Sequence, residues 1–389
     1  MAAPAKAKFM LVTNNEIFRI ETACLNRFQA DPLSLNIATV TGGADTTLTA
    51  LMHPSVGNVV TFDPSPLQIH LLRLKLAVAM SDLTADQAVG FLLRGEGGSK
   101  VFTSSLKDKL PKETVEFFES AGSDEIEQGV LRADNDGVFN KMLRKWFVDE
   151  HGINLGSWHT MDMATKDKVL DVCATNDGAT LTVMIQTFFK GAPWFKALPE
   201  ESQAFILSAL GIAAVSTLKG TGMILRDTDV GLLPSGEFHT DIVLTASTKT
   251  LPPWLTAYGR AVLKKKKADT LLETMLIKAE DLKPSEAEKF AFISLSNIYD
   301  FSPEEKAVAS LKGVAAAALK PGGEILMRRA VGNADGIMKA AGGKVPAGEA
   351  LESVDYNSLF YRNPGTVATA TFATSFMPFS SMMCMSPRE

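Results

Sequence analysis

Cysteine and histidine are scarce in this chain. Its 389 residues include three cysteines, Cys24, Cys173 and Cys384, and five histidines. The cysteines form no CxxC pair, which excludes a disulfide scaffold or a cysteine-rich zinc module and is typical of a protein in a reducing compartment. The histidines form no HExxH motif and no pair four residues apart, so we expect no metal at the functional site.

The chain also lacks a long hydrophobic run and an excess of positive charge. Its most apolar segment, residues 205–218, is shorter than the ~20 residues that a membrane-spanning helix needs, so we expect a buried helix there. The amino terminus becomes polar at Thr13 before any apolar core, unlike a secretory signal. With 39 Lys and Arg against 44 Asp and Glu, no nucleic-acid partner is expected. We expect a cytoplasmic globular protein of one large domain or two.

Strand-like and helix-like segments alternate near the amino terminus. The apolar run 35–40 leads directly into Thr41-Gly42-Gly43, and N-capping residues then predict a helix over 45–53. A second apolar run at 59–62 ends in an acid, and the apolar stripe of 67–80 predicts another helix. The order strand, glycine loop, helix, strand, acid is typical of a nucleotide-binding βαβ unit.

The acid that ends the second strand is Asp63. A carboxylate in that position can accept hydrogen bonds from both hydroxyls of a ribose. The alternative is that Asp63 caps the turn at Pro64-Ser65-Pro66. The glycine loop contains no GxGxxG, so its spacing alone discriminates weakly among nucleotide cofactors.

The same alternation resumes in the carboxy-terminal part. Strands are predicted at 271–277, 290–295, 324–330 and, as an edge strand, 366–373. A helix is predicted over 302–319, where the turn Lys320-Pro321-Gly322-Gly323 stops it. The strands therefore come from both ends of the chain, as in a mostly parallel sheet.

Residues 84–250 are mainly helical in pattern. We therefore predict an α/β fold in which residues 1–83 and 251–389 form one sheet domain. The segment 84–250 is predicted to be a large helical insertion that carries substrate surface.

Several short segments of the two sheet-forming parts carry a family resemblance. They are Ile37–Gly43, Asp63–Gln68, Leu72–Ala77, Leu251–Leu255, Ser294–Phe301, Leu319–Gly323 and Arg328-Arg329. Together they resemble the S-adenosylmethionine:diacylglycerol 3-amino-3-carboxypropyl transferases of betaine-lipid synthesis, within the class I S-adenosylmethionine-dependent enzymes. The resemblance spans residues 16–83 and 251–362. This chain departs from the family at two places. Where the family has a Trp-Glu-Asp-Pro-like run, this chain has Ile17-Phe-Arg-Ile-Glu21, and where the family has Asp-Leu-Asn-Pro, this chain has Asp63-Pro64.

The resemblance implies a class I methyltransferase-like (Rossmann-like) sheet with S-adenosylmethionine as cofactor and no metal. It implies transfer of the 3-amino-3-carboxypropyl group to a hydroxyl acceptor, diacylglycerol, with release of methylthioadenosine. Two alternatives stay open. One is a methyltransferase that acts on a lipid or small molecule with the same cofactor, and the other is a non-catalytic protein that senses S-adenosylmethionine or serves as a scaffold.

Residues expected at the cofactor lie after four of the predicted strands. They are Thr41, Gly42, Gly43, Asp63, Glu280, Asp281, Ser296 and Asn297. The pair Glu280-Asp281 follows a strand after which class I folds often contact adenine, and its alternative is a solvated turn. Asn297 could hold the amino-acid arm by its amide, and its alternative is a turn residue.

An alcohol acceptor has a high pKa and needs a general base, for which Tyr299 and Asp300 are the candidates. The alternatives are that Tyr299 packs over the cofactor and that Asp300 caps the following helix. Arg328 is expected to bind the cofactor carboxylate as a bidentate fork, or else to form a salt bridge at the end of the sheet. Tyr361 and Arg362 are expected to close the pocket.

Four consecutive lysines, Lys264, Lys265, Lys266 and Lys267, form a positive segment in an acidic chain. One interpretation is a solvated helix end. The other is peripheral contact with anionic lipid headgroups, to which each basic residue near the surface contributes about 1 kcal/mol. A lipid acceptor would make such contact useful, because the enzyme has to reach a membrane without spanning it.

Overall fold

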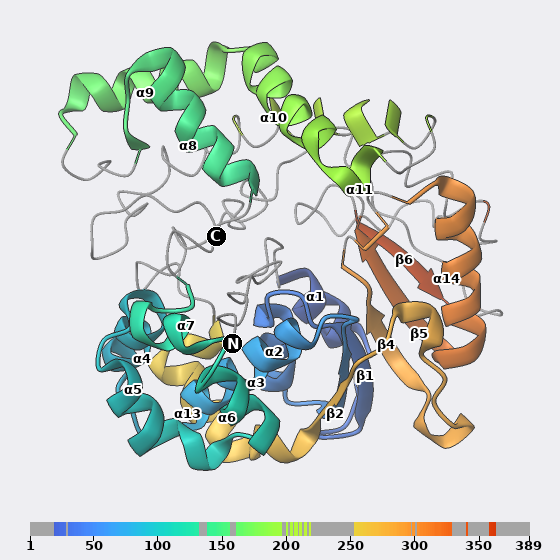
Figure 1. Ribbon diagram of the computed structural model, residues 1–389. Helices are drawn as coiled ribbons and strands as arrows, with labels where there is room; N and C mark the ends of the chain where they lie inside the picture. Colours follow the sequence, from blue (N-terminus) through green and yellow to red (C-terminus); the bar gives the residue numbers. More distant parts are fainter. Residues whose placement is uncertain are drawn as a thin grey trace.

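The computed structural model describes residues 19–28, 30–131, 138–155, 161–196, 253–296, 298–299, 302–328 and 358–362, with residues 200 and 340 and positions within 203–218. At its centre is a sheet of order β3-β2-β1-β4-β5-β6 (Figure 1). The strands are β1 Leu35–Val40, β2 Val56–Phe62, β3 Leu272–Met275, β4 Phe290–Ser294, β5 Leu319–Arg328 and β6 Ser358–Arg362. The first five are parallel and β6 is antiparallel. The predicted α/β, Rossmann-like fold is thereby confirmed.

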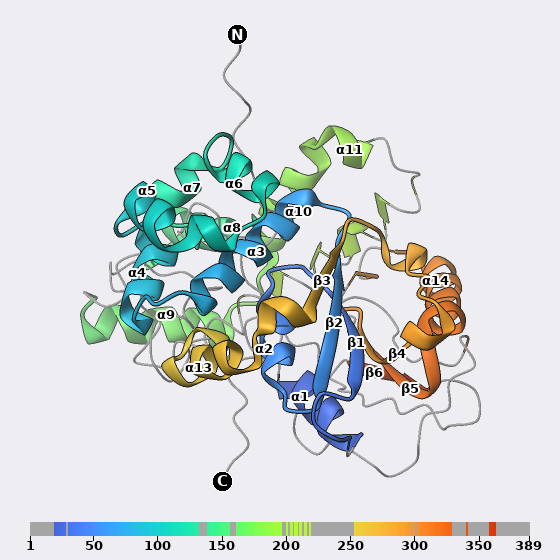
Figure 2. The ribbon, with the colours of Figure 1, turned by 90° about the horizontal axis from the view of Figure 1, so that it is seen from below.

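Helices cover both faces of the sheet, which explains why its central strands are so apolar. α2 Asp45–Met52, α3 Pro66–Met80 and α13 Ala257–Lys266 pack on one face, and α14 Glu304–Ala318 packs on the other (Figure 2). Successive residues of a strand point to opposite faces. Ile37 of β1 accordingly joins the core under α2 and α3, whereas Ala38 joins the core under α14. Every residue of β4 is buried, as expected for a parallel strand covered on both sides.

The helices of the insertion pack into two different hydrophobic cores. The first helices are α4 Ala85–Arg94, α5 Gly98–Val101, α6 Lys112–Phe118 and α7 Ser123–Gln128. Phe91 and Phe118 from these helices belong to the same core as α2 and α3. Helices 85–128, which lie in the segment predicted to be an insertion, therefore share apolar contacts with the sheet domain.

The later helices have a core of their own. They are α8 Val138–His151, α9 Met163–Thr175, α10 Ala179–Gly191 and α11 Pro193–Lys196. Their core surrounds Trp146 and Phe147 and includes Ile206 and Leu210 of the most apolar segment. The described positions of that segment are helical, and four of them, Ile206, Leu210, Ala214 and Leu218, are buried, in agreement with the prediction. In the described part of the chain, no helix is both long and apolar enough to cross a membrane.

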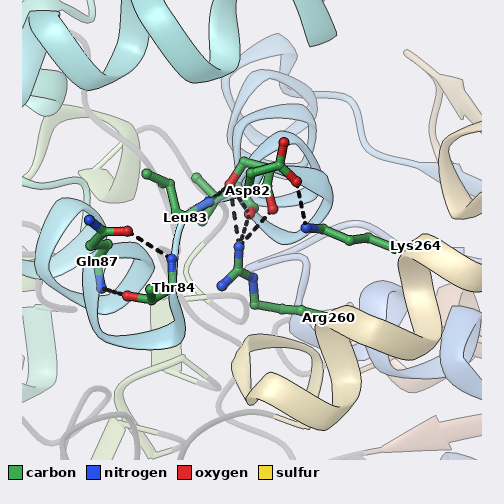
Figure 3. A network of polar contacts seen from close by, with 8 residues as sticks. Asp82, Leu83, Thr84, Gln87, Arg260 and Lys264 are labelled. Atoms are coloured by element: carbon green, nitrogen blue, oxygen red, sulfur yellow. Dashed lines mark hydrogen bonds and ion pairs between the residues drawn. The ribbon is translucent and has the colours of Figure 1, made fainter.

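Arg260 joins the two ends of the insertion at the sheet domain (Figure 3). It is 4% exposed, and its Nη2 donates to the carbonyl oxygens of Val78 and Ser81 at 3.2 and 3.0 Å. These carbonyls belong to the carboxyl end of α3, where helix C=O groups lack partners within the helix. Lys264, one turn further along α13, donates to Asp82 at 3.1 Å. The chain therefore leaves α3 and returns in α13 at the same place.

The carboxy-terminal strands differ in detail from the prediction. β5 begins at Leu319, because Leu319 already pairs with Phe290 before Glu324 pairs with Phe292. The predicted turn at 320–323 is thus an irregularity inside the strand. The antiparallel edge strand is β6, and the predicted strand 366–373 lies outside the described residues.

Candidate functional site

The strand order reverses between β1 and β4, which run side by side. In open α/β sheets, ligands bind at the carboxyl ends of the strands that flank such a reversal. The loops at this edge are residues 41–44 after β1, 63–65 after β2 and the segment from Leu295 after β4. Most of the residues predicted to contact the cofactor lie in these loops, so the fold brings those segments to one edge of the sheet.

The glycine loop, residues 41–44, is fixed through its backbone. Gly42 and Ala44 have φ values of 44° and 75°, in the left-handed region that favours glycine. The Gly42 N–H donates to Asp63 Oδ2 at 3.2 Å, and the Gly42 carbonyl accepts from Gln68 Nε2 at 2.6 Å. The Gly43 carbonyl accepts from Lys75 Nζ at 2.7 Å. The conformation of the loop is therefore set by side chains of β2's end and of α3.

Asp63 is 8% exposed, and its second oxygen accepts from the Ser65 N–H at 2.9 Å. Burial raises the pKa of Asp63, while the N–H groups of Ser65 and Gly42 act in the opposite direction. Asp63 therefore does cap the turn that follows β2. This does not compete with ribose binding, since each carboxylate oxygen has a further lone pair.

Below the glycine loop lies a buried set of threonines. The Thr41 and Thr61 hydroxyls are 2.8 Å apart, as are those of Thr39 and Thr47. Thr47 also reaches Thr61 at 3.3 Å. Because the Thr41 side chain is fully buried in this set, any contact of Thr41 with a ligand would come from its backbone.

The amino end of α2 presents polar groups beside the loop. Ala44 occupies the N-cap position without a side-chain cap. The Thr46 hydroxyl is buried and has no hydrogen-bond partner among the described residues. Helix amino ends carry partial positive charge and unsatisfied N–H groups, which suit a carboxylate.

Two buried groups near the strand reversal were not predicted. Glu21 of α1 Arg19–Arg27 is 1% exposed and accepts from the Ser294 hydroxyl at 3.0 Å, at the carboxyl end of β4. Lys75 is fully buried and lies 2.9 Å from Asp45. A charged residue in the middle of an apolar stripe, as Lys75 is in Leu72–Ala77, was the available signal, because lysines are almost never buried unless paired.

The segment after β4 is described only in part. Ser296 has a φ of 53°, and Asn297 and Asp300 lie outside the described residues. Tyr299 is 5% exposed and packs against α14, where its hydroxyl is 2.8 Å from that of Ser310. Burial raises the pKa of Tyr299 to about 12. This environment favours a packing role for Tyr299 over that of general base.

The other predicted residues are spread along the sheet. Glu280 and Asp281 are exposed in a short 3₁₀ turn, Ala279–Asp281, after β3. Arg328 ends β5 at the carboxyl edge, opposite Ser358. Tyr361 and Arg362 lie opposite Ile325 and Glu324, about 10 to 13 Å further from that edge at ~3.3 Å per residue. The register therefore fixes the backbone position of Tyr361 and Arg362 along β5, and their expected role at the pocket stays a prediction.

Two of the four lysines at 264–267 bind other residues of the protein. Lys264 pairs with Asp82, and Lys266 Nζ donates to the carbonyl oxygens of His53 and Val56 at 2.6 and 2.8 Å. Burial lowers the pKa of Lys266 to about 8. Lys265 and Lys267 are exposed, so only this pair is free to point into solvent.

A hollow of about 380 Å³ lies elsewhere, on the insertion between α8 and α10. It is lined by Glu150, Ala179, Thr180, Val183 and Met184. Figure 1 shows these helices far from β1 and α2. Among the described residues, no group of three or more His, Cys, Asp or Glu side chains is arranged to hold a metal ion.

Comparisons with known proteins leave the family open. A scan against protein-family models gives no match, and searches of curated proteins and of solved structures give none either. The functional assignment therefore depends on the residues at this edge of the sheet and on the resemblance described above.

The packing of Tyr299 leads to a test by double-mutant cycle. Tyr299→Phe and Ser310→Ala each remove the same partly buried hydrogen bond, so each should lower the free energy of unfolding by about 1 kcal/mol. The double variant should lose less than the sum, because the second substitution finds no bond left to break. Urea unfolding of the four proteins measures this. Fully additive losses would show that the two hydroxyls do not interact.

Proposed function

We propose that this chain binds S-adenosylmethionine at the glycine loop and transfers its 3-amino-3-carboxypropyl group to a hydroxyl acceptor, diacylglycerol. The observation that carries the cofactor part is the contact between Asp63 and the Gly42 N–H at the carboxyl end of the sheet. It places a buried carboxylate beside a glycine loop at the strand reversal, where ribose hydroxyls are bound in such folds. The transfer part rests on the family resemblance.

The residues at the site suit the polar parts of this cofactor. Asp63 would accept from the ribose hydroxyls. The amino end of α2 would receive the carboxylate of the amino-acid arm, with the buried Thr46 hydroxyl as a donor, which would give that hydroxyl the partner it lacks among the described residues. Glu280 and Asp281 follow β3, and one of them would accept from the adenine amino group.

The chemistry asks little of the protein beyond positioning and removal of a proton. The sulfonium of S-adenosylmethionine supplies an activated carbon. The acceptor oxygen forms a C–O bond to the methylene of the arm as the C–S bond breaks, and the hydroxyl proton passes to a base. Asp300 is the candidate base, since the raised pKa of Tyr299 and its contact with Ser310 do not favour that residue.

The lysine segment adds a membrane component to the proposal. Lys265 and Lys267 are exposed, and Tyr258 on α13 is 76% exposed. Aromatic side chains with lysines favour the boundary between water and lipid. Tyr258 lies at the amino end of α13 and the two lysines at its carboxyl end. We infer that the exposed side of α13 contacts anionic lipid when the enzyme binds its acceptor.

Cofactor binding is tested by replacing Asp63. Asp63→Asn keeps the shape but removes the charge, and should weaken S-adenosylmethionine binding by about 1.5–3 kcal/mol, the value of hydrogen bonds to a charged group. Burial raises the pKa of this carboxyl, so wild-type affinity should begin to fall at a higher pH than for an ordinary aspartate as the solution is acidified. Calorimetry over a pH series measures both effects. Unchanged affinity in a folded Asp63→Asn protein would refute ribose binding by Asp63.

The transferred group is identified by its products. Incubation with S-adenosylmethionine and diacylglycerol should yield methylthioadenosine and a homoserine ether, detected by mass spectrometry. Asp300→Asn should keep cofactor binding and slow turnover by about 10²-fold or more, the usual contribution of a general base. S-adenosylhomocysteine with a methylated acceptor would instead show a methyltransferase. Binding without turnover would favour a sensor.

Membrane contact is tested with the two exposed lysines only. The variant Lys265→Gln/Lys267→Gln should pellet less with anionic vesicles than wild type, and the difference should shrink as salt is raised, because exposed charges are screened. Lys264→Gln is the matched control, since that lysine already pairs with Asp82. Equal pelleting of all three proteins at low salt would leave the segment as a solvated helix end.

A further inference from the structure

A fully buried lysine lies directly beneath the glycine loop. Lys75 of α3 is 0% exposed, and its Nζ is 2.9 Å from Asp45 Oδ1, whose side chain is 4% exposed. Burial lowers the pKa of Lys75, and Asp45 opposes this effect. Removing the two charges from water costs about as much free energy as their attraction contributes. A protein with a buried ion pair is therefore often no more stable than one with apolar side chains of the same size in its place. Stability alone therefore does not explain why a lysine is buried at position 75.

The contacts of this pair connect three segments that are distant in sequence. Lys75 Nζ donates both to Asp45 and to the Gly43 carbonyl oxygen. The same Asp45 oxygen accepts from Trp254 Nε1 at 2.8 Å. Trp254 belongs to the short 3₁₀ turn Pro253–Leu255, which follows the insertion, and its ring centroid is 5.6 Å from Nζ. The glycine loop, α3 and the chain that returns from the insertion therefore share one polar cluster.

The orientation of the loop follows from these bonds. Gln68 and Lys75, two turns apart on α3, hold the carbonyls of Gly42 and Gly43. In a trans peptide the N–H points opposite to the preceding carbonyl. The Gly43 N–H consequently points away from α3. Because Arg73 of α3 reaches Thr274 of β3, α3 covers its face of the sheet on the β3 side of β1, and a group that points away from α3 points away from that side.

We propose that Lys75 and Asp45 are positioning residues. They fix the Gly43-Ala44 peptide by its carbonyl and, with Gln68 on the Gly42 carbonyl, hold the loop so that the Gly43 N–H faces the ligand at the reversal between β1 and β4. The part that concerns the ligand rests on the proposed function. The part that concerns the loop does not, since the hydrogen bonds are present in the protein alone.

The test removes both charges together, so that neither is left buried and unpaired. In Lys75→Met/Asp45→Asn, Met fills the volume of the lysine and Asn still accepts from Trp254. Without the Lys75 bond, the Gly42 and Ala44 amides should exchange their hydrogens about tenfold faster or more, the change expected for one lost hydrogen bond. The Kd for S-adenosylmethionine should rise by a similar factor.

Lys266→Met is the matched control. It also removes a lysine that donates to two backbone carbonyls, those of His53 and Val56, but these lie away from the glycine loop. It should alter stability without raising exchange at Gly42 and Ala44. If the role of Lys75 were purely structural, the double variant and Lys266→Met would show the same pattern of hydrogen exchange. The faster exchange would then be spread over the fold in both proteins.

The outcomes separate the two proposals. If wild type binds no S-adenosylmethionine, the proposed function fails, and the exchange rates still decide the positioning role. Unchanged exchange at Gly42 and Ala44 in the folded double variant overturns the positioning role. If that variant does not fold, Lys75→Arg decides, because it keeps the charge but moves the donors from Gly43. Wild-type exchange at the loop in Lys75→Arg would then overturn the proposal.

Discussion

The peptide groups of the glycine loop are the constraint on which the site depends. A loop that turns through left-handed conformations at Gly42 and Ala44 exposes peptide groups that need partners. Asp63 takes the Gly42 N–H, and Gln68 and Lys75 take the two carbonyls. The end of β2 and two turns of α3 are therefore committed to the loop, and their side-chain identities follow from its shape.

The buried charge of Lys75 links the glycine loop to the rest of the molecule. A buried lysine requires a buried acid, which places Asp45 at the start of α2, and the same acid oxygen accepts from Trp254. Trp254 brings the returning chain back to the sheet domain, where Arg260 closes the carboxyl end of α3. The helices α8, α9, α10 and α11 can therefore form a separate core while both ends of the insertion stay fixed to the sheet domain at α3 and α13.

The fold was largely predictable from the sequence because its strands are buried on both faces. Short, mainly apolar runs predicted β1 and β4 nearly to the residue, and Pro66 marked the start of α3. The packing of helices 85–128 on the core of α2 and α3 was not predictable, because an amphipathic helix such as α4 has the same pattern whichever core it packs on. The start of β5 was missed because strand pairing overrode the Pro-Gly-Gly turn.

The arrangement of the candidate site was predictable where one local pattern sets the backbone, as at Gly42, Gly43 and Asp63. It was not predictable where partners are distant in sequence: the contacts of Lys75 with Asp45, of Trp254 with Asp45 and of Ser294 with Glu21 join elements through the fold alone. The packing of Tyr299 against α14 and its contact with Ser310 could not be predicted for the same reason, since nothing near Tyr299 in the sequence indicates them.

The central claim is that the fixed glycine loop is a binding site for S-adenosylmethionine. A crystal structure of the protein with methylthioadenosine or S-adenosylmethionine tests it most directly. We predict electron density at the carboxyl ends of β1 and β4, with the ribose hydroxyls on Asp63 and the Gly43 N–H turned toward the ligand. A ligand bound elsewhere, or a glycine loop whose Gly43 N–H faces α3 in the complex, would contradict the account.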